Sequence, residues 1–316
     1  MSTHIEWVRR AVGDAPGKTW NPTTGCDQVS PGCGLPLPGA EDEPHEVCYA
    51  LTLAARLKAM GQVAYQADGD PRTSGPGFAI TMHEDRLGLP LRWRTPTTVF
   101  VNSMSDLFHP WVTEEFIARV FAVMAATPEH TYQVLTKRAP RMASLVGRGT
   151  WGTAGFADAV ERAMAEFTHA DPRAWPLPNV YLGVSVEDQQ RADERIWRLY
   201  RTPAAVRFLS CEPLLGPVDL GMDHDCGDPP HLHCPTKPDW VIVGGASGRG
   251  ARRMDPDWAR DLRDQCRTAG VPYFFKQAGA ALAREWGCSD RKGGKLEEIP
   301  ADLRIREYPA AARSAA

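Results

Sequence analysis

The stretch Thr98-Val99-Phe100-Val101-Asn102-Ser103-Met104-Ser105-Asp106 contains the pattern that decides the fold. Its β-branched and aromatic residues predict a buried strand, and the polar run behind them predicts where that strand ends. A helix is expected next, because Thr113 is a good N-cap and apolar residues recur after it at helical spacing. These apolar residues are Phe116, Ile117, Val120, Phe121 and Met124. Strand, polar end and helix make one unit of a parallel α/β fold.

Similar units recur along the chain. Further strands are predicted near Trp20 and at Tyr132–Leu135, Val180–Val186, Val206–Leu209, Trp240–Val243 and Val271–Phe275. Strands that alternate with helices pair in parallel through right-handed crossovers. A (β/α) barrel typically takes about 250 residues, so 316 residues suit a partial or complete barrel with parallel strands. An open doubly wound sheet is the alternative.

The predicted organisation is a single barrel domain over residues 1–300. Pro-rich insertions interrupt it at 34–46 and 219–238, and residues 301–316 are expected to form a flexible tail. The net charge of −3 gives no overall basic field for nucleic acid, although a local basic patch would suffice. No run reaches 18 apolar residues and no signal peptide is apparent, so we expect a cytoplasmic protein without membrane contact.

Polar residues follow six predicted strands in succession. They are Asn102–Asp106, Thr136–Arg138, Glu187–Asp188, Ser210–Glu212, Gly244–Ser247 and Lys276–Gln277. Each group alone could form an ordinary turn. The carboxyl ends of parallel strands meet at one edge of a sheet, however, so six such groups favour a shared polar site. His109 and Trp111 follow Asp106 and are interpreted as packing residues or a lid.

Three cysteines, Cys26, Cys33 and Cys48, lie between a tryptophan-led turn and a predicted helix. Closely spaced thiolates on one loop are typical ligands of iron–sulfur clusters. Their spacing differs from C-x3-C-x2-C and from the paired C-x2-C of zinc ribbons. Buried structural thiols are the alternative. The chain has eight cysteines and no leader, so reduced thiols are expected rather than disulfides.

The chain resembles an uncharacterised family of phage and bacterial proteins that is placed beside the radical S-adenosylmethionine (SAM) superfamily. The resemblance extends from about Glu6 to about Pro309. The stretches that carry it are Thr19–Cys26, Val29–Cys33, Cys48–Ala50, Val99–His109, Gln133–Arg138, Leu182–Asp188, Phe208–Gly216, Val241–Gly245 and Phe274–Gln277.

The resemblance implies a barrel of radical SAM type and a [4Fe–4S] cluster held by Cys26, Cys33 and Cys48. The fourth iron would be open to SAM. An external electron donor would reduce the cluster, and SAM would then be cleaved reductively. The chain departs from the family pattern twice. It inserts about Gly34–Glu46 between the second and third cysteines, and it has Ala246 where the pattern resembles Gly-Gly-Glu-Ser.

The predicted site divides into catalytic and cofactor-binding residues. Catalytic candidates are Glu212, Cys211 and Asp106; cofactor-binding candidates are Asn102, Ser103, Lys137, Ser185, Glu187, Gly244, Gly245, Lys276 and Gln277. The carboxylates could bind ribose hydroxyls or the SAM ammonium, or transfer protons. Helix capping is the alternative for Glu187, and a buried strand position is the alternative for Cys211.

A second metal site is a weaker candidate, since Cys226, His231, His233 and Cys234 could bind a structural zinc in the second insertion. The sequence leaves the substrate open, and the phage occurrence of the family suggests a nucleotide or nucleic acid. Two other functions stay open: a metal-stabilised nucleic-acid-binding protein and a redox-sensing protein without radical chemistry.

Overall fold

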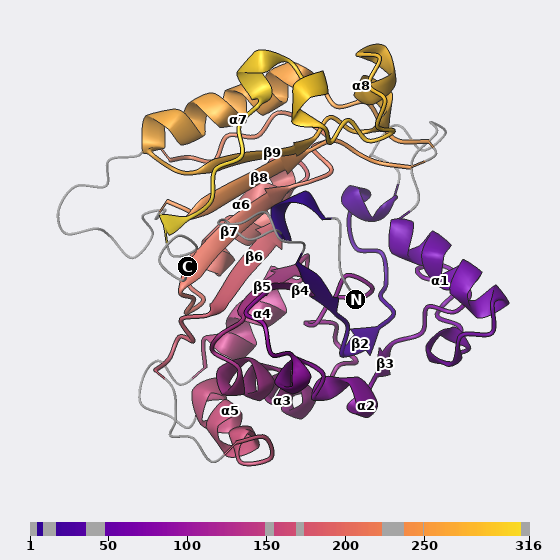
Figure 1. The fold of residues 1–316 in the computed structure, drawn as a ribbon, viewed down its shortest axis with the longest axis vertical. Coiled ribbons are helices and arrows are strands. Elements are labelled where there is room, and N and C mark those ends of the chain that lie inside the picture. The colour runs from indigo at the N-terminus through magenta and orange to yellow at the C-terminus, as the bar shows by residue number, and fades with distance from the viewer. Residues whose placement is uncertain are drawn as a thin grey trace. The chain divides into compact units, whose positions relative to one another are not determined.

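The computed structural model describes residues 5–8, 17–35, 48–148, 155–168, 174–222, 237–248 and 250–310 (Figure 1). Its strands are β1 (Lys18–Trp20), β2 (Thr23–Thr24), β3 (Thr81–Met82), β4 (Thr98–Val101), β5 (Thr131–Thr136), β6 (Val180–Ser185), β7 (Val206–Cys211), β8 (Trp240–Gly244) and β9 (Tyr273–Gln277). Its helices are α1 (Tyr49–Ala59), α2 (Glu84–Leu87), α3 (Glu114–Ala126), α4 (Ala139–Val146), α5 (Phe156–Met164), α6 (Gln189–Tyr200), α7 (Pro256–Ala269) and α8 (Ala280–Glu285).

Seven strands form one sheet in the order β1-β4-β5-β6-β7-β8-β9, while β2 and β3 pair separately and antiparallel. The registered pairs β1–β4, β4–β5, β7–β8 and β8–β9 are parallel. The strand order never reverses, whereas a doubly wound sheet reverses at its switch point. The predicted α/β fold is therefore confirmed as a partial (β/α) barrel, with β1 and β9 as the edge strands.

The predicted strands agree closely with the observed ones. The strand at Thr98–Val101 has the predicted bounds, and β6 is buried at all six positions, as the continuous apolar pattern requires. The main difference lies in β9, which begins at Tyr273 rather than Val271. Val271 instead follows Gly270, the left-handed C-cap of α7, and its N–H donates to the carbonyl of Cys266.

The described residues fall into two compact units. Unit 1 comprises the described residues within Met1–Val29, Cys48–Gly183 and Arg201–Ala205. Unit 2 comprises those within Ser30–Val47, Val184–Tyr200 and Val206–Ala316. The strand β6 contributes residues to both.

In unit 1, α3 packs against α5, and Figure 1 shows α3, α4 and α5 together. Nine of the thirteen residues of α3 are buried, which explains its largely apolar sequence. Thr113 caps the helix: its hydroxyl accepts a hydrogen bond from Phe116 N at 3.2 Å. The core under β1 contains the fully buried Trp20, whose ring lies 5.9 Å from that of Tyr132.

In unit 2, the buried Trp240 of β8 is the centre of an aromatic cluster. Its ring lies 5.6 to 6.1 Å from those of Phe208, Phe274 and Tyr308. The segment after residue 301, predicted as a flexible tail, begins with a 3₁₀ turn at Ala301–Leu303 and then forms an antiparallel bridge from Arg306 to Phe274 of β9. Phe275 N donates to Ile305 O at 2.8 Å, and Trp240 Nε1 donates to Glu307 O at 2.8 Å.

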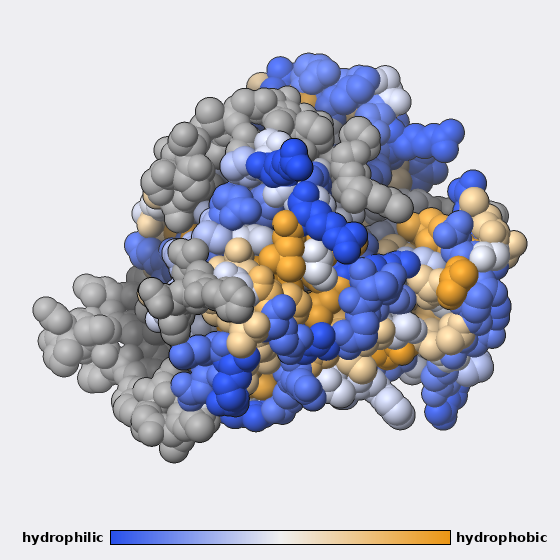
Figure 2. All heavy atoms as spheres, turned by 60° about the horizontal axis from the view of Figure 1, so that its bottom comes forward, coloured by the Kyte–Doolittle hydropathy of each residue, from blue (hydrophilic) through white to orange (hydrophobic). Residues whose placement is uncertain are grey.

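Figure 2 shows one face of the molecule, on which hydrophilic residues surround smaller apolar areas. Large exposed apolar side chains of unit 1 include Tyr49, Met60, Val63 and Trp111. Within the described part of the chain, no helix combines the length and apolar character needed to cross a bilayer.

Replacing the α3 cap tests how much local sequence stabilises unit 1. Thr113→Ala removes the acceptor for Phe116 N and is expected to lower the free energy of unfolding by about 1 kcal/mol, measured by urea denaturation. Thr113→Ser keeps the acceptor and should retain most of that stability. Equal losses in both variants would show that packing, rather than capping, sets the contribution of Thr113.

Candidate functional site

Two polar turns interlock where β1 and β4 end in unit 1. Asn21 Nδ2 donates to Ser103 Oγ at 3.1 Å, and Asn21 Oδ1 accepts from the backbone N–H of Met104 at 3.2 Å. The hydroxyls of Thr23 and Ser105 lie 2.8 Å apart, and Gly25 N donates to Met104 O at 3.0 Å. These contacts extend the β1–β4 pairing beyond the strands and direct the chain into Cys26.

Asn102, a predicted cofactor-binding residue, occupies the end of β4 in a strained conformation. Its φ of 62° lies in the left-handed region, where asparagine is tolerated better than most residues. Its Nδ2 donates to Thr23 Oγ1 at 2.9 Å, while its buried Oδ1 has no hydrogen-bond partner among the described residues. Strain and an unmatched buried acceptor at a strand end are features that often accompany function.

Asp27, next to Cys26, joins several segments of unit 1. Its Oδ1 accepts from Thr73 Oγ1 at 2.8 Å, and its Oδ2 lies 2.9 Å from His109 Nε2. Its main-chain carbonyl accepts from Arg138 Nη2 at 3.4 Å and from the Cys26 thiol at 3.5 Å. The backbone beside the first cysteine is therefore fixed by contacts from three distant parts of the sequence.

The hydrogen bonds of His109 define its tautomer. Nδ1 accepts from Trp111 N at 3.2 Å, so the proton is on Nε2 and is donated to Asp27. Burial lowers the pKa of His109, although the hydrogen bond that His109 donates to Asp27 opposes this. Burial acts to raise the pKa of Asp27, but hydrogen bonds from Thr73 and His109 outweigh it and leave this pKa lowered. The pair is thus a neutral imidazole and a carboxylate near pH 7.

Cys26 and Cys48 pack against the same apolar cluster of unit 1, formed by Ala50, Ala54, Tyr65, Phe78 and Met104. Cys48 is the N-cap residue of α1, as expected for a cysteine just before a helix. The six cysteines in the described part of the chain are thiols: Cys26, Cys33, Cys48, Cys211, Cys266 and Cys288. The described residues contain no group of three His, Cys, Asp or Glu side chains arranged to hold a metal ion.

Asp106 connects the ends of β4 and β5. Its carboxylate accepts from Thr136 Oγ1 at 2.7 and 2.9 Å, from Lys137 N at 3.0 Å and from Phe108 N at 3.0 Å. The side chain is buried, and both oxygens serve these bonds. The structure thus brings Asp106 and the Lys137 backbone together as predicted, in an arrangement that holds two strand ends.

In unit 2, a single 3₁₀ turn at Pro31–Cys33 carries the second cysteine. Glu187 clamps it: Oε1 accepts from Ser30 Oγ at 2.8 Å, and Oε2 accepts from Arg195 Nη1 at 2.9 Å. Arg195 Nη1 also donates to Ser185 O at 2.9 Å. Glu187 and Arg195 are buried, so this is an interior ion pair. The predicted residues Cys33, Ser185 and Glu187 are thereby brought together.

A second constellation of predicted residues forms where β7 and β9 end. Lys276 Nζ donates to both carboxylate oxygens of Glu212 at 2.5 and 2.7 Å, and Gln277 Nε2 donates to one of them at 3.2 Å. Both charged side chains keep about a sixth of their surface exposed, at 17% for Glu212 and 15% for Lys276. The group presents a carboxylate, an ammonium and an amide at one place.

Gly244 and Gly245 lie at the end of β8, between the strands that carry this group. A Cβ at Gly245 would come within 2.2 Å of the Ala278 carbonyl oxygen, so only glycine permits this close backbone approach. A Cβ at Gly244 would touch Gln277 and Glu212 only at ordinary contact distance. The side chain of Cys211 is completely buried, and burial raises its thiol pKa well above the usual range.

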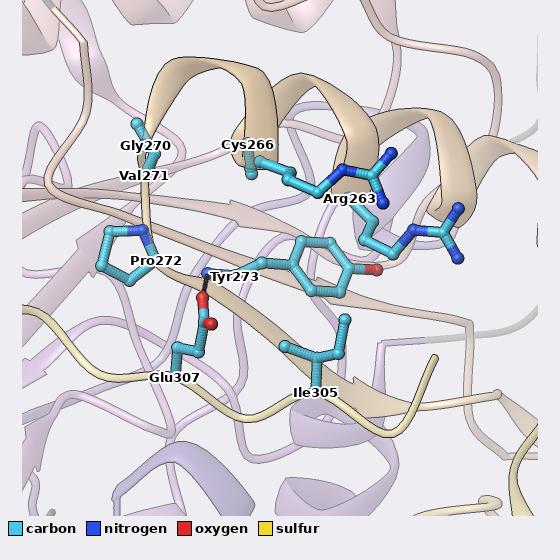
Figure 3. Close-up of a pocket in the computed structure, with 9 residues that line it drawn as sticks. Arg263, Cys266, Gly270, Val271, Pro272, Tyr273, Ile305 and Glu307 are labelled. Atoms are coloured by element: carbon cyan, nitrogen blue, oxygen red, sulfur yellow. Dashed lines mark hydrogen bonds between the residues drawn. The ribbon is translucent and has the colours of Figure 1, made fainter. Parts of the chain in front are cut away.

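The pocket in Figure 3 has a volume of about 400 Å³ and lies away from these predicted residues. It is at the amino end of β9, where Tyr273 N donates to the Glu307 carboxylate at 3.0 Å. Burial and the Glu307 charge raise the pKa of Cys266 in its wall to about 12, so that thiol is unreactive. No predicted site residue lines this pocket.

The comparisons with known proteins place the chain in a family. Residues 2–303 match the family described as "Protein of unknown function (DUF5131)". The chain belongs to this family. No curated protein and no solved structure matches it.

In this DUF5131 member the predicted strand-end residues lie at strand ends, but the residues that fix the backbone beside Cys26 and Cys33 were not predicted. These residues are Asp27, Thr73 and Arg195, together with His109, for which the sequence predicts packing or a lid. The only local signal was an acidic residue directly after Cys26. The zinc candidates Cys226, His231, His233 and Cys234, like most of the two insertions, lie outside the described residues.

Removing the Glu187 charge tests the clamp on the Cys33 turn. Glu187→Gln leaves Arg195 buried without its counter-charge, so we expect a loss of about 3 kcal/mol in the free energy of unfolding. Glu194→Gln is the matched control, because it makes the same chemical change at an exposed position of α6 and should cost far less. Equal denaturation midpoints for the two variants would contradict the clamp.

The neighbouring glycines of β8 provide a second test. Gly245→Ala forces a Cβ against the Ala278 backbone and should lower the melting temperature by several degrees. Gly244→Ala introduces only ordinary contacts and should change it much less. The reverse order in a thermal melt would show that the path of the chain after β8 is not set by this contact.

Proposed function

We propose that this protein is an iron–sulfur enzyme of the radical SAM type. Cys26, Cys33 and Cys48 would hold a [4Fe–4S] cluster, because thiolates are the ligands that such clusters take. When bound and reduced, the cluster would supply the electron that cleaves SAM. The proposal takes its three-cysteine ligand set from the sequence and from the resemblance to proteins beside the radical SAM superfamily.

The observation that carries the proposal is the position of Cys26. This thiol directly follows the interlocked ends of β1 and β4, and it shares an apolar cluster with the thiol of Cys48. Reactive groups of parallel α/β folds gather at the carboxyl ends of strands. Apolar surroundings restrict the access of water to a cluster, which is one way in which proteins tune it.

The chain's own residues have distinct tasks in this proposal. Glu212, Lys276 and Gln277 would bind and orient polar groups of SAM or of the substrate, because their side chains offer acceptors and donors at strand ends. The backbone at Gly244 and Gly245 would line the same place. Asn102 and Ser103 would contribute at the end of β4, where the Asn102 Oδ1 is an available acceptor.

Asp106, Glu187 and Cys211 receive different tasks. The first two act as positioning residues, because their carboxylates are buried in bonds that hold strand ends and the Cys33 turn. Cys211 is a buried strand thiol, which leaves Glu212 as the stronger candidate for contact with reacting groups. Lys137 and Ser185 would contribute through their backbone positions beside these carboxylates.

The proposed chemistry also defines partners and surroundings. It requires an external electron donor and a reducing compartment, for which the cytoplasm is the candidate. A nucleotide or nucleic acid is the proposed substrate class, on the basis of the family resemblance alone. The net charge of −3 favours a small substrate, or a nucleic acid bound at a local site, over a nucleic acid bound along an extended surface.

Metal analysis of protein purified without oxygen tests the proposal. We expect about four iron and four acid-labile sulfide per chain, lost in each of the single variants Cys26→Ala, Cys33→Ala and Cys48→Ala. Cys288→Ala is the matched control, because Cys288 is also a half-buried thiol and should be dispensable. Loaded protein should then convert SAM to 5′-deoxyadenosine after reduction.

Other results would contradict the proposal in distinguishable ways. Bound zinc, or no metal, would favour the nucleic-acid-binding alternative. A cluster without SAM cleavage would favour the redox-sensing alternative. Iron that persists in all three single variants would show that the ligand set is wrong.

A further inference from the structure

We propose that Asp27, held by Thr73 and His109, is a positioning residue that orients the thiol of Cys26 for cluster binding. The inference deepens the proposed function and rests on it, since Cys26 is a ligand only if a cluster binds. It concerns residues of unit 1 alone.

The contacts converge on two consecutive residues. Thr73 holds the two residues after Cys26: its hydroxyl donates to Asp27 Oδ1 at 2.8 Å, and its carbonyl accepts from Gln28 N at 2.9 Å. His109 holds the second carboxylate oxygen at 2.9 Å. With Gly25 N bound to Met104 O on the preceding side, the backbone is fixed before and after the thiol.

The His109 side chain is itself fixed. It is 1% exposed, and each ring nitrogen has a partner, so its ring plane and its tautomer are set by the fold. Arg141 secures the loop on which it lies, donating to the carbonyls of His109 and Val112. The histidine is therefore a rigid donor, and Asp27 transmits that rigidity to Cys26.

This arrangement is that of an outer shell around a ligand. Groups that hydrogen-bond beside a metal ligand set its orientation, and their loss weakens metal binding or changes its properties. Asp27 also presents its carbonyl to the Cys26 thiol at 3.5 Å and to Arg138 at 3.4 Å. A residue that only filled space would not need four polar partners.

Thiol reactivity in the metal-free protein tests the proposal without any cluster. The rate of alkylation of Cys26 by iodoacetamide would be followed by mass spectrometry, with Cys48 as the internal reference. Thr73→Val removes one hydroxyl from a half-buried position and should raise the Cys26 rate about five-fold. Thr73→Ser keeps the hydroxyl and should restore the wild-type rate.

A second pair of variants tests the hydrogen bond from His109 to Asp27. His109→Leu removes the donor to Asp27, whereas His109→Gln can still offer an N–H, so only the leucine variant should expose Cys26. An unchanged Cys26 rate in both Thr73→Val and His109→Leu would overturn the proposal. An equal rise at Cys48 would also overturn it, because general loosening would then be the cause.

Protein that carries the cluster allows measurements that a purely structural role of Thr73 would leave unchanged. Thr73→Val should shift the electron paramagnetic resonance signal and the midpoint potential of the reduced cluster, and Thr73→Ser should restore both. Unchanged values in the valine variant would overturn the proposal. If the wild type takes up no iron, the proposed function fails, and the alkylation rates alone decide whether Asp27 positions Cys26.

Discussion

The hydrogen bonds between the turn after β1 and the turn after β4 are the constraint on which the first thiol depends. Asn21 and Thr23 bind Ser103, Met104 and Ser105 through side chains and backbone. Two parallel strands normally separate after their last ladder bond, yet here polar side chains continue the connection. The chain is thereby guided into Cys26 at the sheet edge where parallel α/β proteins carry their chemistry.

Hydrogen-bonded carboxylates repeat this design elsewhere. Asp27 fixes the backbone beside Cys26, Asp106 joins the ends of β4 and β5, and Glu187 with Arg195 fixes the turn that carries Cys33. A buried charge is costly unless it is paired and hydrogen-bonded, and each of these carboxylates has several donors. Asp106 and Glu187 are buried, whereas Glu212 and its partner Lys276 remain partly exposed. Exposure therefore separates Asp106 and Glu187, which hold the scaffold, from Glu212, which is accessible to a ligand. Asp27 is also partly exposed, at 33%, but Thr73 and His109 occupy its two carboxylate oxygens.

The sequence predicted the fold well because strand signals are local. Val99–Val101 and Trp240–Val243 are short apolar runs with β-branched or aromatic residues, and each became a buried strand. The strand-end residues followed from topology, which brought Glu212, Lys276 and Gln277 together as expected. The hydrogen bonds that fix the backbone beside Cys26 and Cys33 could not be predicted in this way. Thr73 and Asp27 are 46 residues apart, and Ser30 and Glu187 are 157 apart, with no periodic pattern connecting them.

The separation in sequence between Ser30 and Glu187 affects the nascent chain during translation. Ser30 emerges from the ribosome 157 residues before Glu187, and at about 5–20 residues per second this delay is on the order of ten to thirty seconds. Arg252, which donates to Pro31 O, emerges later still. During translation the Cys33 turn thus lacks both side chains that later hold it. Its thiol acquires a fixed setting only after Arg252 has been synthesised, so insertion of the proposed cluster is expected to follow that point rather than to accompany synthesis of the turn.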